Sequence, residues 1–391
     1  MIEKIGNDCT SCTACINICP KQCISIEKNV DDFGYPRIDK SKCVRCNKCE
    51  NICPVINEIN NTSLSIKAYA IKNKDEKIRL NSTSGGVFSL LANYVLENNG
   101  YVVGAAYDRT FNVKHIIVND KSELYKLRGA KYIQSELGNI FTEIKQLLIH
   151  NKLVLFSGTP CQCIGLKSYL KKDYRNLIIV DLICHGVPSS KVWQSYIGYR
   201  ANKENNGIRP IKINMRCKDS GWTNYAYSTE FTYENGKKTL ISSENDLFMK
   251  AFVGNICLRP SCSNCKAKGL KRAADFTLGD YWGIWNQCPE FDDDKGVSAV
   301  FVHSDKAIEL LHRLNNQLEL LEVDVQKAYE DNSSFIKPSK SNLNRNEFLK
   351  HINANNFEEL INKYFSIKKS KNNMISRIER KLKRVIFNKK E

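Results

Sequence analysis

The feature that most constrains this chain is a cysteine pattern that occurs twice near its N-terminus. Eight of the seventeen cysteines form two runs with the spacing Cys-x2-Cys-x2-Cys-x3-Cys-Pro. The runs are Cys9, Cys12, Cys15, Cys19 and then Cys43, Cys46, Cys49, Cys53. Each iron of a 4Fe-4S cubane takes one soft thiolate ligand. Three closely spaced cysteines and a more distant fourth therefore predict two iron–sulfur clusters in this stretch.

The repeated spacing is that of a bacterial ferredoxin, in which the fourth cysteine of each run ligates the other cluster. We predict that cluster one is held by Cys9, Cys12, Cys15 and Cys53. We predict that cluster two is held by Cys43, Cys46, Cys49 and Cys19. A zinc ribbon would use two CxxC pairs instead, and a disulfide framework would need an oxidising compartment. Cys23 is left over and is interpreted as a small buried residue.

The length of 391 residues suggests two or three domains. We expect a two-cluster 4Fe-4S ferredoxin domain at 1–60 with short strands at 24–26 and 36–38. We expect a polar linker at 57–65, an oxidoreductase domain at 66–340 and a helical C-terminal region at 341–391. No apolar run approaches the ~20 residues that span a bilayer. The first cluster motif also begins too early to leave room for a signal peptide. We therefore expect a cytoplasmic protein.

The net charge of +17 would usually suggest a nucleic-acid partner, but its distribution argues against one. Residues 1–60 carry eight Lys or Arg and eight Asp or Glu, whereas residues 368–391 carry ten Lys or Arg and two Glu. Residues 374–386 form a predicted basic amphipathic helix, which could make peripheral contact with an anionic membrane. A solvated or partner-docking terminal helix is the other interpretation.

Apolar strands and helices are predicted to alternate between residues 67 and 189, which is typical of parallel βαβ units. The predicted strands are 67–71, 101–106, 114–118, 153–156 and 177–183. The predicted helices are 82–98, 136–150, 160–172 and one from Ser189. After residue 210 the strands 211–216, 225–233 and 237–241 look antiparallel, with a hairpin turn at Asn235-Gly236. Further strands are predicted at 274–279 and 297–303. The expected fold is an α+β ferredoxin-like domain followed by an α/β domain with an antiparallel extension.

Ligands of such α/β folds bind at the carboxyl ends of the strands, and two unusual loops, 157–163 and 184–188, follow strands here. The stretch Ser84-Gly85-Gly86 opens a helix, where free backbone N–H groups could hold a phosphate. An ordinary helix cap is the alternative interpretation of this stretch.

A second cysteine group, Cys257-x4-Cys262-x2-Cys265, predicts another metal site that needs a fourth ligand. Cys184 is the leading candidate, and Cys161, Cys163, Cys217 and Cys288 are the others. The group would suit a 2Fe-2S cluster, a third 4Fe-4S cluster or zinc. Cys161, at a helix N-terminus, could instead be a redox nucleophile. His185 could transfer a proton or serve as a structural hydrogen-bonding residue.

Five stretches together carry a family resemblance. They are Ser84-Gly85-Gly86, Lys131-Tyr132-x-Gln134-Ser135, Gly158-Thr159-Pro160-Cys161-Gln162, the run Asp181 to Ser189, and Gly279-Asp280-Tyr281-Trp282-Gly283. They resemble the beta subunit of the hydrogenase and dehydrogenase that use the deazaflavin coenzyme F420, over about residues 66–340. Two departures are visible: Ala130 stands where the family usually has serine, and Cys217 stands where an acidic residue is usual, which argues against Cys217 as a ligand.

The resemblance implies a bound FAD beside an iron–sulfur cluster. The implied cofactor-binding residues are Ser84, Gly85, Gly86, Lys131, Tyr132, Gly158, Thr159, Pro160, Cys161 and Gln162. The implied ligands of the flavin-side cluster are Cys184, Cys257, Cys262 and Cys265. No catalytic residue is identified.

We therefore expect an oxidoreductase that passes single electrons through its clusters and exchanges hydride at FAD. Its expected partners are a ferredoxin or another redox protein and a small-molecule substrate, with a polysaccharide-related biosynthetic compound as one candidate. Two alternatives remain: a non-catalytic subunit that wires ferredoxin to a partner enzyme, and a structural iron–sulfur protein of a biosynthetic complex.

Overall fold

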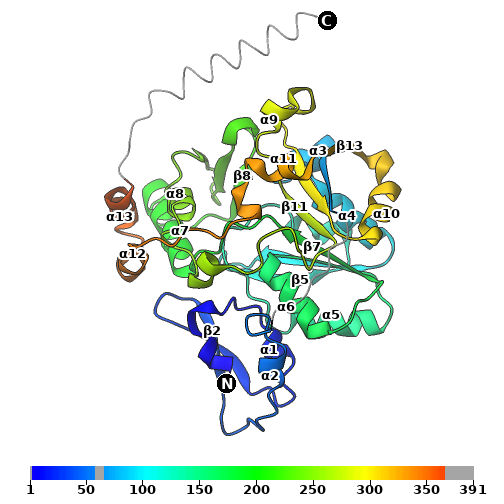
Figure 1. Cartoon of the computed structure of the whole chain (residues 1–391). Helices are drawn as coiled ribbons and strands as arrows, with labels where there is room; N and C mark the ends of the chain where they lie inside the picture. The colour runs from blue at the N-terminus through cyan, green and yellow to red at the C-terminus, as the bar shows by residue number, and fades with distance from the viewer. Residues whose placement is uncertain (1, 58–65, 366–391) are drawn as a thin grey trace, which may run out of the picture.

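The computed structural model describes residues 2–57 and 66–365 (Figure 1). Most of the predicted linker at 57–65 and the whole predicted helix at 374–386 lie outside the described residues. Among the described residues, no helix is long and apolar enough to cross a membrane.

The N-terminal unit consists of two short halves that repeat the same local structure. Its elements are η1 (Ile2–Asp8), α1 (Ala14–Asn17), β1 (Ile24–Lys28), β2 (Gly34–Ile38) and α2 (Lys48–Asn51). The predicted strands are confirmed, and they pair antiparallel with Ile24 opposite Ile38. Ser11 and Thr13 have left-handed backbone conformations, and so do Arg45 and Asn47 at the equivalent places of the second run. The repeated cysteine spacing thus corresponds to a repeated backbone path.

The large domain is built on one mixed sheet of eight strands in the order β13-β3-β12-β11-β7-β6-β4-β5. In chain order its strands are β3 (Lys67–Asn73), β4 (Tyr101–Tyr107), β5 (Val113–Val118), β6 (Val154–Gly158), β7 (Leu177–Leu182), β11 (Phe276–Asp280), β12 (Ser298–Val302) and β13 (Leu318–Val323). The neighbours β4, β6, β7 and β11 are parallel, as predicted.

The expectation of parallel units is wrong for β3 and β5. β3 pairs antiparallel with β12 and β13, and β5 pairs antiparallel with β4. Only five residues join β4 to β5, too few for the crossover that a parallel pair requires. β13 was not predicted, and half of its six side chains are exposed. The helix expected from residue 136 begins only at Ile140, because Glu136 pairs with Lys114 in an isolated bridge.

Helices cover both faces of the sheet. α4 (Val87–Glu97) and α10 (Asp305–Arg313) share one apolar core with the sheet. α5 (Ile140–Ile149) and α6 (Pro160–Leu170) share a second core, on the other face. That second core also contains Cys12, Ala14 and Ile52 of the ferredoxin unit. Figure 1 accordingly shows the ferredoxin unit directly below α5 and α6.

The predicted antiparallel extension is confirmed as a three-stranded sheet. It has the order β10-β9-β8, with β8 (Lys212–Cys217), β9 (Ser228–Thr232) and β10 (Lys238–Ser242). Gly236 has φ +79° in the predicted hairpin turn. An aromatic core joins this sheet to α7 (Ser190–Asn205), α8 (Leu247–Val253), α12 (Arg345–His351) and α13 (Phe357–Tyr364). The described part of the predicted C-terminal region therefore packs on the large domain.

The remaining elements are short. They are α3 (Glu76–Leu80), η2 (Lys121–Lys126), η3 (Thr223–Tyr225), η4 (Pro260–Asn264), α9 (Ile284–Gln287), η5 (Pro289–Phe291), η6 (Asn315–Gln317), α11 (Val325–Glu330) and η7 (Ser333–Phe335). Of these, η4 matters most for the site, because it carries Cys262.

Candidate functional site

The eight cysteines of the ferredoxin unit line two separate cavities. One is lined by Cys9, Cys12, Cys15 and Cys53. The other, of about 420 Å³, is lined by Cys19, Cys43, Cys46 and Cys49, together with Cys23. The cavities divide the cysteines in the same way as the predicted ligand sets. Burial, with smaller contributions from Cys9 and Cys53, raises the pKa of Cys12 to about 12, and metal binding would have to displace that proton.

Cys23 is buried, as interpreted from the sequence, but it is not remote from the predicted clusters. Its Sγ lies 3.4 Å from Sγ of Cys19. Burial raises the pKa of Cys23 to about 12, and the neighbouring Cys19 and Cys43 contribute further. The thiol of Cys23 therefore keeps its proton and can donate it to Cys19 as a weak hydrogen bond.

The second cysteine group forms where three chain segments meet at the carboxyl ends of the parallel strands. Cys161 is the second residue of α6, and Cys184 follows β7. An antiparallel bridge between Pro188 and Leu258 brings the segment containing Cys262 and Cys265 alongside. The Arg259 N–H donates to Val187 O at 2.8 Å and fixes this pairing.

Four thiols of this group are close enough to perturb one another, and Cys161 is among them. Burial raises the pKa of Cys161 above its usual range, with contributions from Cys265 and Cys184. Burial also raises the pKa values of Cys184 and Cys262 to about 12. Cys262 and Cys265 raise the pKa of Cys184 further, and Cys161 and Cys265 raise the pKa of Cys262 further. These mutual contributions indicate that Cys161, Cys184, Cys262 and Cys265 lie near one another.

Cys257 lies apart from this set. Its side chain is fully buried in the aromatic core of α7 and α8. Of the other thiols in the group, only Cys262 contributes to the raised pKa of Cys257, which burial dominates. The backbone of Cys257 has a structural contact instead, since its carbonyl accepts the Ser189 N–H at 3.1 Å. Cys161 therefore neighbours the other thiols of the group, whereas Cys257 neighbours only Cys262.

Cys12, a predicted ligand of cluster one, lies beside this second group. A Cβ atom added to Gly165 of α6 would lie 2.7 Å from Cβ and 3.0 Å from Sγ of Cys12. Cys12 also contributes to the raised pKa of Cys161. Because Gly165 has no side chain, the predicted cluster-one ligand packs against the helix that carries Cys161.

Arg259 joins the ferredoxin unit to the large domain. Its side chain is 1% exposed. It donates to Cys9 O at 2.7 Å, to Gly34 O at 2.9 Å and to Gln134 Oε1 at 3.1 Å. The guanidinium also lies 4.5 Å from the ring centroid of Tyr35. One buried cation therefore connects the first cysteine run, β2 and the run that contains Lys131 and Tyr132.

The loop from Gly158 to Gln162 is held by a chain of internal hydrogen bonds. The Thr159 N–H donates to Gln162 Oε1 at 2.9 Å, and Gln162 Nε2 donates to Ser135 Oγ at 2.9 Å. Ser135 Oγ in turn lies 3.0 Å from Nδ1 of His115. Burial lowers the pKa of His115 to about 4, so this imidazole is neutral. Gln162 thus shapes the loop, and Pro160 begins α6.

The helix start at Ser84–Gly86 is tied to the strand β12. Ser84 Oγ donates to Val297 O at 2.6 Å, and the Gly85 N–H donates to Ser298 Oγ at 2.9 Å. A Cβ on Gly85 would lie 2.1 Å from Ile71 O, so only glycine fits there. These two donors are used within the protein. A phosphate at this place would depend on the unpaired N–H groups of the first turn of α4.

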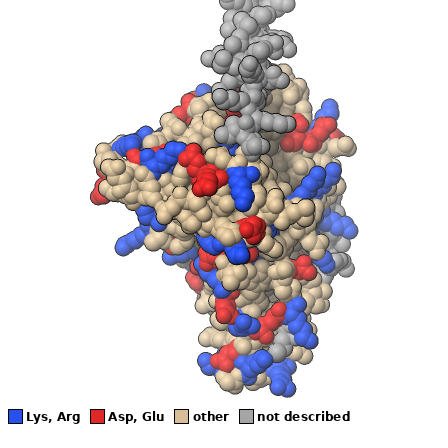
Figure 2. Space-filling model, turned by 90° about the vertical axis from the view of Figure 1, so that its left-hand side faces the viewer, with Lys and Arg blue, Asp and Glu red and all other residues tan. Residues whose placement is uncertain are grey.

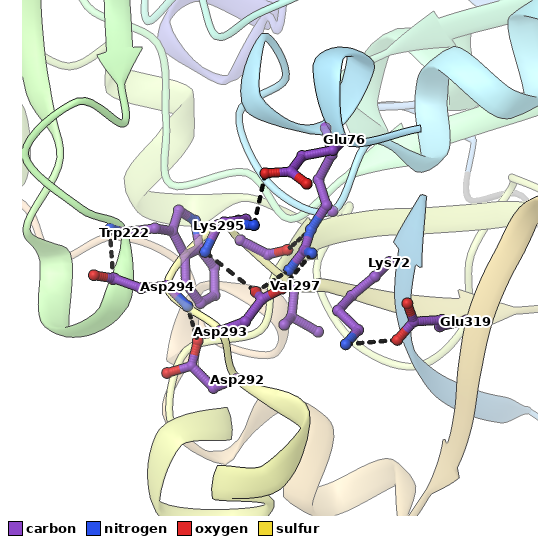
Figure 3. A network of polar contacts seen from close by, with 12 residues as sticks. Lys72, Glu76, Trp222, Asp292, Asp293, Asp294, Lys295, Val297 and Glu319 are labelled. Atoms are coloured by element: carbon purple, nitrogen blue, oxygen red, sulfur yellow. Dashed lines mark hydrogen bonds and ion pairs between the residues drawn. The ribbon is translucent and has the colours of Figure 1, made fainter. Parts of the chain in front are cut away.

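A polar network supports this helix start from the loop before β12 (Figure 3). Asp294 accepts the Trp222 N–H at 2.9 Å, and Lys295 pairs with Glu76 at 2.6 Å. Arg79 Nη1 donates to Asp293 Oδ2 at 2.7 Å. These contacts join α3 and Trp222 to the loop before β12, and Val297 O of that loop accepts the hydrogen bond from Ser84 Oγ.

Tyr132 contacts a buried ion pair that the sequence analysis did not identify. Arg216 Nη1 donates to the Tyr132 hydroxyl oxygen and to Asp280 Oδ2, both at 3.0 Å. The side chains of Arg216 and Asp280 are only 2% and 13% exposed. Asp280 belongs to the Gly279–Gly283 stretch that carries part of the family resemblance, and Arg216 lies in a predicted strand. The only sign of this ion pair in the sequence was therefore the acidic residue in that stretch.

Lys131 and two unpaired polar atoms lie close to this ion pair. Lys131 donates to Arg128 O at 3.1 Å and to Gly129 O at 3.3 Å, and burial lowers its pKa to about 7. Its Nζ lies 5.7 Å from the ring centroid of Tyr107. Within the described residues, Tyr107 Oη and Arg216 Nε are buried without a hydrogen-bond partner. Such orphaned atoms fit a place where a polar group binds.

The other candidate residues have structural settings. Nε2 of His185 lies 2.6 Å from Asn255 Oδ1, which fits the structural interpretation of this residue. Cys163 is buried under the sheet, and Cys288 packs in a separate core. Cys217 lies within 4.8 Å of Asp219 and Glu230, but Glu230 pairs with Lys238 at 3.2 Å. A cavity of about 690 Å³ lies elsewhere, between the ferredoxin unit and α12.

Sequence models of known families match most of the chain. A 4Fe-4S dicluster domain matches residues 8–57. The model "Coenzyme F420 hydrogenase/dehydrogenase, beta subunit N-term" matches residues 68–141, and the corresponding C-terminal model matches residues 151–327.

Whole-chain comparisons add less. No curated protein matches the chain. One similar solved structure is a chain of the xenon-derivatised F420-reducing [NiFe] hydrogenase complex from Methanosarcina barkeri, with 18% identity and a TM-score of 0.47. The alignment covers 77% of this chain and 92% of that one. By its matches to both halves of the subunit, the chain belongs to the coenzyme F420 hydrogenase/dehydrogenase beta subunit family and carries a 4Fe-4S dicluster domain ahead of it.

Proposed function

We propose that this iron–sulfur protein is a flavoprotein oxidoreductase that links one-electron transfer through 4Fe-4S clusters to two-electron chemistry at a bound FAD. The observation that carries the proposal is the packing of Cys12 against Gly165. In this packing Cys12, a predicted ligand of cluster one, lies against the helix whose first turn carries Cys161. A short path therefore runs from the ferredoxin unit to the carboxyl ends of the central strands, where α/β folds bind their ligands.

The same edge of the sheet would hold a third iron–sulfur cluster. Its proposed ligands are Cys161, Cys184, Cys262 and Cys265, which replaces Cys257 in the set implied by the resemblance. Burial raises the pKa of Cys184, but the nearby cations Lys268 and Arg272 oppose that shift. Cations around the ligands stabilise the negative charge of thiolates and tune the potential of a cluster.

The residues at this edge fit a bound FAD in part. The orphaned Tyr107 Oη and Arg216 Nε offer polar contacts, and the loop from Gly158 to Gln162 is preorganised by its own hydrogen bonds. Lys131, Tyr132 and Arg216 would orient the group. When bound, FAD supplies exchange of two electrons as hydride on one side and of single electrons with clusters on the other.

One observation favours the alternative of a wiring subunit without flavin. The donors of Ser84 and Gly85 are used by the protein itself, and the Lys131 ammonium already donates to backbone carbonyls. If these residues only support the fold, the chain would carry electrons between clusters and leave hydride chemistry to a partner enzyme.

Cofactor analysis separates the two proposals. Protein purified without oxygen would be assayed for iron, sulfide and released flavin per chain. We expect about 12 irons and one FAD, by cubane stoichiometry. The reduced protein would then be offered small-molecule hydride acceptors, beginning with the deazaflavin coenzyme and polysaccharide precursors. About 8 irons and no flavin, even after FAD is added, would reject the flavoprotein and favour the wiring subunit.

A further inference from the structure

The charges of the ferredoxin unit are unevenly distributed. Residues 1–60 have no net charge, yet five of their eight cationic side chains lie near the cluster-two cysteines. These five are Lys21, Lys40, Lys42, Arg45 and Lys48. Of the acidic residues, Glu50 lines the same cavity and Asp39 is close in the chain, whereas Asp31 faces the large domain and pairs with Arg345 at 3.2 Å. The charged side chains at the end that points away from the large domain are therefore mainly cationic.

Four of these cations are available to a partner. Lys21, Lys40, Arg45 and Lys48 line the cluster-two cavity and are exposed. Among residues 2–57 and 66–365, none of the four forms an ion pair or a side-chain hydrogen bond, whereas Lys42 pairs with Asp39 at 3.3 Å. Figure 2 shows Lys and Arg side chains, with Asp and Glu among them, at the lower end of the molecule, where Figure 1 places the ferredoxin unit. We call these four residues the cationic rim.

An apolar side chain and a predicted cluster ligand lie inside the rim. Val44 is 57% exposed, which is unusual for a valine beside a structured motif. Cys46 is the only one of the eight predicted ligands that is exposed. Transient electron-transfer interfaces are small, and docking surfaces commonly combine an apolar centre with a polar rim. This end of the unit has both features, directly over a predicted redox centre.

The opposite end of the unit is already occupied. Cys12 packs against Gly165, and Arg259 holds Cys9 and Gly34 to the large domain. An external protein therefore reaches cluster two more readily than cluster one. The charge of the rim selects partners with a complementary, negative surface.

We propose that the cationic rim docks an acidic one-electron carrier protein, with Val44 at the centre of the contact and Cys46 as the nearest ligand of cluster two. This inference rests on the proposed redox function. In each encounter the carrier is oxidised by one electron and cluster two is reduced by one electron, or the reverse. No bond forms or breaks, and no proton is required.

The test measures electron transfer to the full-length, cluster-loaded protein. A small ferredoxin of net negative charge, reduced beforehand, is mixed with the oxidised protein in a stopped-flow instrument, and cluster reduction is followed by absorbance. We expect the second-order rate constant to fall steeply as salt is added, because salt screens the attraction. The double variant K40E/R45E should react about tenfold more slowly at low salt. The neutral variant K40Q/R45Q should lie between.

Matched controls keep the result interpretable. K152E makes one charge reversal at an exposed lysine of the large domain, and it should change the rate by less than about twofold. Iron content and direct reduction by dithionite should be the same in all variants, which verifies that the clusters are intact. Since cluster reduction is read directly, the test applies whether or not the protein binds FAD.

Three outcomes would overturn the proposal. One is a rate that neither salt nor K40E/R45E changes. Another is an equal rate with a carrier of net positive charge. The third is binding to phosphatidylglycerol vesicles or duplex DNA that K40E/R45E abolishes while the carrier rate stays the same, which would assign the rim to a membrane or to nucleic acid.

Discussion

The two cysteine-rich regions of this protein reach a similar arrangement by different routes. In the ferredoxin unit, all eight predicted ligands lie between residues 9 and 53, in two runs of identical spacing. In the second region, the four neighbouring thiols come from α6, the end of β7, η4 and the residue after it. The first arrangement is local in sequence, whereas the second exists only once the sheet has formed.

This difference explains where sequence analysis succeeded. Short spacing dictates which thiols can surround one cubane, and the cavities divide the first eight cysteines as the spacing predicts. In the second region, spacing favoured Cys257 because it lies near Cys262 and Cys265 in the chain. The bridge between Pro188 and Leu258 instead buries Cys257 in the aromatic core. Cys161 lies at the start of α6, about 100 residues before Cys262, and no spacing rule connects two cysteines so far apart.

The largest expected effect comes from replacing Cys161 and, in a separate variant, Cys257. If the assembled set binds a cubane, Cys161→Ser should lose about four of the twelve irons, while the ferredoxin clusters remain. Cys257→Ser removes a buried thiol outside the set and should keep all irons, with a modest loss of stability. Iron and sulfide analysis and electron paramagnetic resonance spectra of the reduced proteins would measure both. Loss of iron in C257S but not in C161S would restore the set implied by the resemblance.

The fold shows the same difference. Features set by local sequence were predicted, whereas features set by long-range contacts were not. The short strands of the ferredoxin unit, the hairpin at Gly236 and the parallel centre of the large sheet followed from local pattern and periodicity. The antiparallel edge strands did not, because an apolar run does not reveal the direction of its partner. β13 was missed because half of its six side chains are exposed and only Leu318 is buried, so it lacks the alternation of a half-buried strand.

Long-range polar pairs were the other omission. Arg216 and Asp280 are 64 residues apart, and Arg259 contacts carbonyl oxygens of Cys9 and Gly34 more than 200 residues away. Lysine and arginine are mostly exposed in proteins, so a single cation in the sequence carries no sign of burial. Only the tertiary structure indicates that these two arginines connect segments of the site.

A smaller effect is expected where the two cysteine regions touch. Gly165→Ala adds a methyl group that would lie 2.7 Å from Cβ of Cys12. Overpacking of this kind typically costs about 1–3 kcal/mol, partly offset by the better helix propensity of alanine. We expect a wider separation of the regions, slower electron transfer from the ferredoxin clusters to the third site, and unchanged iron content. Flash reduction followed by time-resolved absorbance would measure the rate.

Gly104→Ala is the matched control for that variant. Gly104 is in β4, and an added Cβ would meet only ordinary contacts, the nearest at 3.5 Å from a Leu127 side-chain atom. Its electron-transfer rate should equal that of the unmodified protein. An unchanged rate in both alanine variants would mean that Cys12 and α6 do not limit transfer between the regions.

The smallest expected effect concerns Cys23, the ninth cysteine of the ferredoxin unit. Although burial opposes it, hydrogen bonds from the backbone and thiol of Cys23 lower the pKa of Cys19 overall. Hydrogen bonds to ligand sulfur raise the reduction potential of a cluster, because they stabilise its more negative, reduced state. Cys23→Ala should therefore keep both clusters and make the potential of cluster two slightly more negative. Cys23→Ser, which retains a donor, should shift it less. If the reduction potential is equal in all three proteins, Cys23 only fills space in the core. If C23A loses iron, Cys23 is itself a ligand of a cluster.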